Sequence, residues 1–214
     1  MADLGSAVKR NGRKGSYHFG DLRNALVGAA VELAGRGGPS AVTVRAAARR
    51  VGVTPTAAYR HFTNHGQLLR AAKEQAQCSL FGAMSAALAT LEPGTHGLTR
   101  LNAAGRGYIA FAMSEPGLFR TAFCDTADGE ERDSPAFDLL SELLDELVEV
   151  GFTDPTHRPN AEMAAWSTVH GLASLVLDRA GIDAVTREQT ITDTLAAIER
   201  CFATGPNATD YRSR

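Results

Sequence analysis

The chain has little that would tie it to a membrane or to a disulfide framework. Its three cysteines, Cys78, Cys124 and Cys201, are odd in number and widely spaced, which fits neither a disulfide framework nor a metal site. No apolar run approaches the roughly 18 residues that a transmembrane helix needs, and the N-terminus lacks the apolar stretch of a signal peptide. We therefore expect a cytoplasmic protein with no membrane contact.

Motifs of the common enzyme classes are also missing. The sequence has no Gly-x-Ser-x-Gly elbow, phosphate-binding loop, dinucleotide glycine pattern, His-Glu-x-x-His motif or Cys-x-x-Cys pair. Its six histidines are scattered along the chain. We therefore expect no enzymatic activity, no metal and no cofactor.

Nothing in the sequence reads as a strand, because β-branched residues never alternate with polar ones for long. Apolar residues recur instead with helical spacing, as Leu22, Leu26, Ala29 and Leu33 do after a candidate N-cap at Asp21. The 44% hydrophobic content can bury a substantial core. The pattern predicts an all-α protein of about nine helices, at 21–35, 43–51, 55–61, 64–89, 96–113, 116–123, 135–150, 160–180 and 186–203.

Charge is divided unevenly along the chain. Residues 1–75 carry 12 Lys and Arg against 4 Asp and Glu, whereas the other 139 residues carry 10 against 20. A basic part of this kind indicates a polyanionic partner. We predict a disordered basic arm at 1–16, a helix-turn-helix domain at 17–72, a helical effector-binding and dimerisation domain at 73–204, and a flexible tail at 205–214.

The segment from Thr43 to Phe62 predicts two short helices joined by a tight turn. Gly52 can adopt the positive φ that such a turn needs, and the small Ala48 four residues earlier lets the helices cross closely. This is the geometry of a helix-turn-helix, in which the second helix enters the major groove of DNA. An ordinary helical hairpin is the alternative reading of the spacing alone.

The side chains of the second helix favour the DNA-binding reading. Its apolar content is limited to small residues, which allow close approach to base edges. Tyr59 and His61 can bond to phosphates, Arg45 can reach a phosphate or a guanine edge, and the helix N-terminus at Thr43 can hold a phosphate. The polar side chains offered by this helix are Thr54, Thr56, Tyr59, Arg60 and His61.

Residues 17–72 resemble the DNA-binding domain of the tetracycline-repressor-like (TetR) family, with Tyr59, His61-Phe62 and Leu68-Leu69 in register. The resemblance implies that operator DNA is contacted by Arg45, Thr54, Thr56, Ala57, Tyr59 and His61. The chain departs from the family at the start of the fourth helix, where Thr63 and His65 stand in place of a phosphate-binding lysine. Protonated His65 can take over that role, and the basic arm can lie in the minor groove through Lys9, Arg10, Arg13 and Lys14.

The C-terminal part resembles one subgroup of the same family, with a C-terminal domain of the Trp-His-Gly type. The resemblance lies in residues 108–123 and in Trp166, His170 and Gly171. Small residues beside Trp166 and His170 would let another helix approach closely, so helices 160–180 and 186–203 are expected to form a four-helix bundle with a second copy. The two recognition helices would then lie about 34–36 Å apart, matching a palindromic operator.

The effector site is expected to be an apolar cavity in the C-terminal domain, and the ligand an unknown, apolar small molecule. Packing in the core is the alternative for each candidate residue. For His170 that alternative is a hydrogen bond to a backbone carbonyl. The candidates are Phe81, Met84, Tyr108, Phe111, Phe119, Phe123, Trp166 and His170.

These observations predict a DNA-binding transcriptional regulator, a repressor that a small-molecule effector releases from a palindromic operator. A DNA-binding activator and an effector-independent dimeric DNA-binding protein are the alternatives. An open apolar cavity in the C-terminal core would favour sensing, and a densely packed core would favour the effector-independent alternative.

Overall fold

The computed structural model describes residues 19–95, 97–126, 134–178 and 181–208. Over these residues the chain forms nine α-helices and no strand, which confirms the predicted fold class. Three 3-10 helices, η1 (Pro39–Ala41), η2 (Pro155–His157) and η3 (Pro206–Ala208), lie between and after them. The α-helices are α1 (Phe19–Gly37), α2 (Val44–Val51), α3 (Pro55–Tyr59), α4 (His65–Ala89), α5 (Leu98–Ser114), α6 (Pro116–Ala122), α7 (Pro135–Glu149), α8 (Ala161–Asp178) and α9 (Ala184–Phe202).

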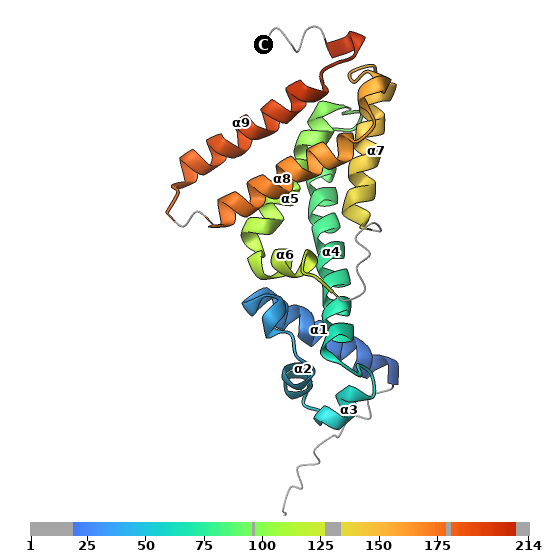
Figure 1. Ribbon diagram of the computed structural model, residues 1–214, viewed down its shortest axis with the longest axis vertical. Coiled ribbons are helices and arrows are strands. Elements are labelled where there is room, and N and C mark those ends of the chain that lie inside the picture. Colours follow the sequence, from blue (N-terminus) through green and yellow to red (C-terminus); the bar gives the residue numbers. More distant parts are fainter. Residues whose placement is uncertain (1–18, 96, 127–133, 179–180, 209–214) are drawn as a thin grey trace, which may run out of the picture.

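The molecule is elongated, and α1, α2 and α3 form one of its ends (Figure 1). The long helix α4 leaves this end and runs into the larger helical part, where α5 and α7 pack against it and α8 packs against α5 and α7. Helix α6 lies at the junction and packs against both α1 and α4. Helix α9 lies along the outer side of α8, away from α4.

Three helices begin after residues of the types that are preferred at N-caps. The side chains of Thr43, Thr54 and Asn64 accept hydrogen bonds from the backbone N–H groups of Ala46, Ala57 and Gln67 at the starts of α2, α3 and α4. Each such cap is worth about 1 kcal/mol of stability. These bonds fix the first turns of the helices that surround the predicted helix-turn-helix.

Two helix boundaries near this end differ from the prediction. Asp21 is not an N-cap, because α1 begins at Phe19 and places Asp21 in its first turn. A carboxylate there interacts favourably with the positive end of the helix dipole. Helix α3 ends at Tyr59, not near His61. The backbone N–H groups of Arg60 and His61 still bond back to the carbonyls of Ala57 and Ala58, so both residues continue as a tight turn.

The expected flexible tail does not begin at residue 205. The N–H of Gly205 donates to the carbonyl of Phe152 at 2.8 Å, and the N–H of Asn207 donates to the carbonyl of Gly151 at 3.0 Å. Ala208 is fully buried. Residues 205–208 are therefore docked on the turn after α7, and residues 209–214 lie outside the described residues.

One continuous core links the two ends of the molecule. Leu26 and Leu68, near the end formed by α1, α2 and α3, belong to the same buried cluster as Leu80 in the middle of α4 and Leu143 on α7. The expected domain boundary at residue 73 falls inside α4, within this core. A displacement in the larger part can therefore reach the small one through packed side chains.

Candidate functional site

The turn between α2 and α3 has the geometry that the sequence predicts. Gly52 adopts φ +80°, a left-handed conformation that favours glycine. The backbone N–H groups of Gly52 and Val53 both donate to the carbonyl of Ala48 at 3.0 Å, and Ala48 is fully buried. The two helices therefore meet in a closed, well-packed turn.

Helix α3 is anchored by one side and exposed on the other. Ala58 is fully buried and Phe62, just after the helix, is 2% exposed, so these two residues hold the segment to the core. Tyr59 is 41% exposed, and Thr54, Thr56 and Arg60 are also exposed. Ala57 and His61 are half-buried. Most polar side chains of the predicted recognition helix are thus available to a partner, and none is fully buried.

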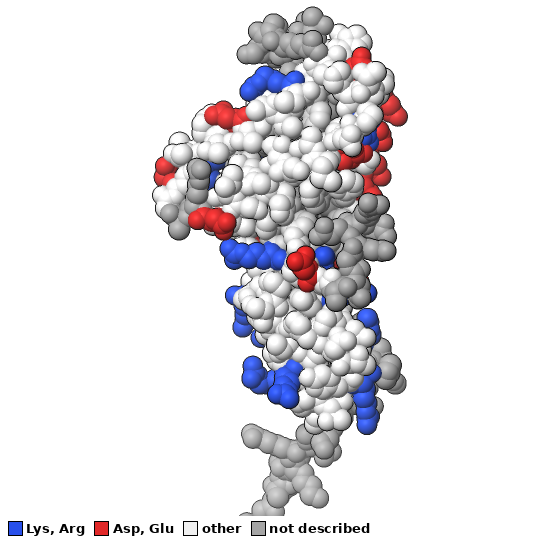
Figure 2. Space-filling model, in the orientation of Figure 1, with Lys and Arg blue, Asp and Glu red and all other residues white. Residues whose placement is uncertain are grey.

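The surface around α3 is basic. Residues 19–72 contain seven Arg and no Lys against two acids, Asp21 and Glu32, and Glu32 forms an ion pair with Arg50. Figure 2 shows Lys and Arg gathered at this end and Asp and Glu mainly on the larger part. Arg23, which the sequence analysis did not single out, lies with its guanidinium carbon 5.2 Å from the ring centroid of Phe62. The exposed arginines are Arg23, Arg36, Arg45, Arg49, Arg50 and Arg60.

The remaining predicted DNA contacts divide into two groups. Thr43 is exposed, although its hydroxyl already accepts the capping bond of α2, and His65 is exposed as the first residue of α4. The residues expected to form the basic arm, Lys9, Arg10, Arg13 and Lys14, lie outside the described residues.

An aromatic cluster fills the centre of the larger part. The hydroxyl of Tyr108 lies 2.8 Å from Nδ1 of His170, and the His170 ring stacks on Phe119 with centroids 5.4 Å apart. Burial raises the pKa of Tyr108, so its hydroxyl remains protonated. Nδ1 of His170 is therefore paired with a side-chain hydroxyl.

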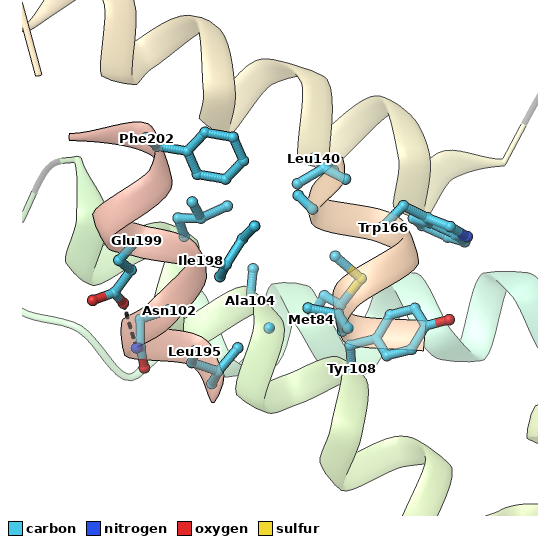
Figure 3. Close-up of a pocket in the computed structure, with 14 residues that line it drawn as sticks. Met84, Asn102, Ala104, Tyr108, Leu140, Trp166, Leu195, Ile198, Glu199 and Phe202 are labelled. Atoms are coloured by element: carbon cyan, nitrogen blue, oxygen red, sulfur yellow. Dashed lines mark hydrogen bonds between the residues drawn. The ribbon is translucent and has the colours of Figure 1, made fainter. Parts of the chain in front are cut away.

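A small cavity lies between α4, α5, α7, α8 and α9 (Figure 3). Met84, Tyr108 and Trp166 line it, and at one end Asn102 donates to the buried carboxylate of Glu199 at 2.5 Å. Its free volume is about 40 Å³. This volume accommodates one or two water molecules but no aromatic ring.

A much larger cavity, of about 740 Å³, lies between α7 and α8 and reaches α4 and the end of α6. We call it the α7–α8 cavity. Its size is within the range of small-molecule sites. Its lining includes three of the predicted effector residues, Phe123, Trp166 and His170, together with Gln77, Ser134, Phe137, Asp138, Ser141 and Met163.

The other predicted effector residues do not face the α7–α8 cavity. Phe111 and Phe119 are 6% and 3% exposed and pack in the core, whereas Phe81 is exposed on α4 and lines neither cavity. Ser134, Phe137 and Asp138 also line the cavity and were not predicted from the sequence. Residues at the start of an amphipathic helix give no sign in the sequence that they face a cavity.

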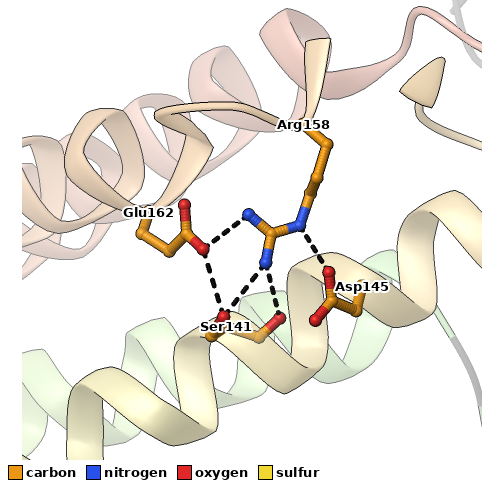
Figure 4. Close-up of polar contacts among 4 residues, drawn as sticks. All are labelled: Ser141, Asp145, Arg158 and Glu162. Carbon is orange, nitrogen blue, oxygen red and sulfur yellow. Dashed lines mark hydrogen bonds and ion pairs between the residues drawn. The ribbon is translucent and has the colours of Figure 1, made fainter. Parts of the chain in front are cut away.

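A polar cluster fastens the two helices that wall this cavity (Figure 4). Arg158 donates to Asp145 at 2.7 Å, to Glu162 at 2.5 Å and to the hydroxyl of Ser141 at 3.0 Å. Burial opposes ionisation of Glu162, but the hydrogen bonds from Arg158, its own backbone and Ser141, with the Arg158 charge, bring its pKa below the ordinary value. In the same way the bonds to Asp145 and Glu162 outweigh burial and raise the pKa of Arg158. The cluster therefore remains charged and fixes α7 to the start of α8.

Two further classes of site can be judged for the described part of the chain. Within it no group of three or more His, Cys, Asp or Glu side chains could hold a metal ion. No helix there is long and apolar enough to cross a membrane.

Two family models match the sequence. Residues 26–72 match the bacterial regulatory proteins of the tetR family, and residues 101–204 match the tetracyclin repressor-like C-terminal domain. The first match covers α2, α3 and the turn between them, and the second covers most of the cavity walls. No curated protein matches the chain.

Solved structures with the same fold cover nearly the whole chain. A protein of unknown function from Rhodococcus sp. RHA1 is 23% identical, with a TM-score of 0.72 over 89% of this chain and 100% of its own. A TetR family transcription regulator from Marinobacter aquaeolei VT8 is 20% identical, with a TM-score of 0.63 over 86% of this chain and 96% of its own. RolR, solved with resorcinol, is 17% identical, with a TM-score of 0.61 over 90% and 93%. At these identities the likeness establishes the fold.

Proposed function

The chain belongs to the tetracycline-repressor (TetR) family of DNA-binding bacterial regulatory proteins, and we propose that it is a dimeric repressor that a small molecule releases from its operator. The observation that carries the proposal is the exposed, polar and basic surface around α3. A short helix with small side chains, held by Ala58 and Phe62 from beneath, is suited to enter a major groove.

The proposed DNA contacts follow from exposure and charge. Tyr59, Thr54 and Thr56 face outward on α3, and Arg45 and Arg60 flank them with positive charge. Phosphate contacts from such side chains would position the helix, and contacts to base edges would select the sequence. The full proposed set is Thr43, Arg45, Thr54, Thr56, Ala57, Tyr59, Arg60, His61 and His65, with Lys9, Arg10, Arg13 and Lys14 of the arm.

Dimerisation is proposed to occur through α8 and α9. Leu175 on α8 is 57% exposed and Val185 on α9 is 80% exposed, which is costly for apolar side chains left in water. A Cβ atom on Gly171 would meet nothing within 4 Å, so there is open space beside this position of α8. A groove of about 300 Å³ between α8 and α9, which Gly171 and Leu175 line, adds to this apolar face.

The α7–α8 cavity supports a ligand-responsive regulator over an effector-independent one. The cavity is open, has a volume of about 740 Å³ and is lined by three aromatic rings, which suits it to hold a small organic molecule. RolR, which shares the fold, has been solved with resorcinol, a small aromatic molecule. We propose that the effector of this protein binds in the α7–α8 cavity.

An electrophoretic mobility shift on the DNA upstream of the protein's own gene tests the proposal. We expect a discrete complex that resists an excess of unrelated DNA and dissociates when an effector is added. Affinity should fall steeply with salt, because several phosphates are neutralised. Equal affinity for unrelated DNA would refute a specific repressor.

A further inference from the structure

The α7–α8 cavity combines aromatic rings with a single acid: Phe123, Phe137 and Trp166 line it, and its only charged side chain among the described residues is Asp138. We propose that the effector is an aromatic organic cation, with its ring against Trp166 and its protonated amine beside Asp138. This inference rests on the proposed function only in taking the cavity as the effector site.

The aromatic wall is built around Trp166. Its ring centroid lies 5.5 Å from that of Phe137 on α7 and 5.9 Å from that of Phe123 at the end of α6. Both rings are steeply inclined to the indole, at 61° and 73°, so the three do not form a closed stack. Such an arrangement can receive a further ring, and indole is the aromatic side chain that attracts cations most strongly.

The charges around the cavity favour a cation over an anion. Asp138 is an exposed carboxylate at its edge, and among the described residues no Lys or Arg lines it. Two basic side chains that contact residues of the cavity lining or their chain neighbours are engaged elsewhere: Arg158 is bound to Asp145 and Glu162, and the ammonium of Lys73 donates to the carbonyl of Cys124 at 2.9 Å. Among the described residues, an anionic ligand would meet Asp138 without a compensating positive charge in the cavity lining.

A buried hydroxyl supplies a second point of recognition. Ser134 is 4% exposed and lines the cavity, yet among the described residues its Oγ has no hydrogen-bond partner. A buried polar atom without a partner is unfavourable, so a ligand N–H that bonds to it gains more than it would at a solvated site. Ser134 and Asp138 lie on the same turn at the start of α7 and can share one amine.

Trp166 makes the test specific, because it is the only tryptophan of the chain and it lines the cavity. Its fluorescence is titrated, without DNA, with three probes that share a phenyl ring and differ in charge: phenethylamine, phenethyl alcohol and phenylacetate. We expect saturable quenching by the amine at a concentration about ten-fold lower than by the carboxylate, with the alcohol between them. Equal responses, the reverse order or no saturable response to the amine would overturn the proposal.

Two variants test whether Asp138 is the source of the preference for the amine probe. Asp138→Asn should remove the advantage of the amine over the alcohol and leave the response to the alcohol unchanged. Glu142→Gln is the matched control, because Glu142 is an exposed acid on the same helix that does not line the cavity. If both variants lower the response to the amine equally, the preference comes from overall charge and the proposal is wrong.

The result of the fluorescence titration does not depend on the result of the operator mobility-shift assay. Cation selectivity at Trp166 can be present or absent in a protein that binds no operator, and operator binding can be present without this selectivity. Failure of the fluorescence titration therefore refutes the ligand class alone, whereas failure of the mobility shift refutes the repressor.

Discussion

A Cβ atom added to Gly117 would lie 2.3 Å from the carbonyl oxygen of Ala34. Gly117 is buried in the first turn of α6, and Ala34 lies near the end of α1. The backbones of the two helices are therefore in direct contact. Because α6 leads to Phe123 at the cavity and α1 packs on α2 and α4, this contact joins the proposed effector site to the DNA-binding end.

Gly117→Ala should force α6 away from α1. Because the obstructing atoms are backbone, we expect the overpacking to lower the free energy of unfolding by about 1–3 kcal/mol, measured by urea denaturation. Gly82→Ala is the control: Gly82 lies in α4 with open space around it, and alanine there should raise stability by about 0.5–1 kcal/mol. A Gly117→Ala protein as stable as the wild type would show that the helices are not so close.

Tyr59→Ala should weaken binding to the operator by about 1–3 kcal/mol, because it removes an exposed side chain of α3 that is proposed to contact DNA. Fluorescence anisotropy with labelled operator measures the change. Phe81→Ala is a matched control, since Phe81 is an aromatic residue of similar exposure on α4. An unchanged affinity in Tyr59→Ala, or an equal loss in both variants, would place the recognition surface elsewhere.

Gly171→Arg should convert the protein to a monomer while leaving each subunit folded. The site has room for a side chain within the subunit, so any loss must arise where a second copy packs. Sedimentation velocity measures the mass of the assembly. Operator affinity should also fall in the monomer, because the two half-sites are no longer bound by one linked pair of subunits. Gly82→Arg, at an equally open glycine on α4, should remain dimeric. A dimeric Gly171→Arg protein would rule out α8 as the interface.

Glu162→Gln should destabilise the protein at neutral pH but not in acid. The pKa of Glu162 is lowered in the folded protein, so its contribution is present above the unfolded pKa of about 4.3 and is lost as pH falls through the folded value. We expect a difference from wild type of about 1 kcal/mol at pH 7 that closes below about pH 4. Thermal denaturation across this range measures it, with Glu142→Gln as the exposed control. A difference independent of pH would mean that the charge of Glu162 contributes nothing.

Features governed by neighbouring residues could be predicted from the sequence. The capping bonds of Thr43, Thr54 and Asn64 and the left-handed conformation of Gly52 depend on chain segments of a few residues. The residue types in these short segments are therefore almost sufficient to specify the capping bonds and the turn conformation. The helix-turn-helix was predictable for this reason.

Features that depend on how distant helices meet could not be predicted. Ser134 and Asp138 become cavity residues only because α7 is set against α8 by the Arg158 cluster. Phe81 and Phe111 are the same residue type at helical positions, yet one is exposed and the other buried. The docked segment after α9 depends on bonds from Gly205 and Asn207 to the turn after α7, some 50 residues earlier.

The central claim is that two copies of α3 read one duplex, and selection of bound sequences from a random pool of duplex DNA tests it most directly. The account predicts enrichment of a palindrome whose half-sites are centred about one helical turn, or a multiple of it, apart. The Tyr59→Ala protein should enrich it less strongly. Enrichment of a single unrepeated half-site, of no sequence at all, or of the same palindrome to the same degree by Tyr59→Ala would contradict the account.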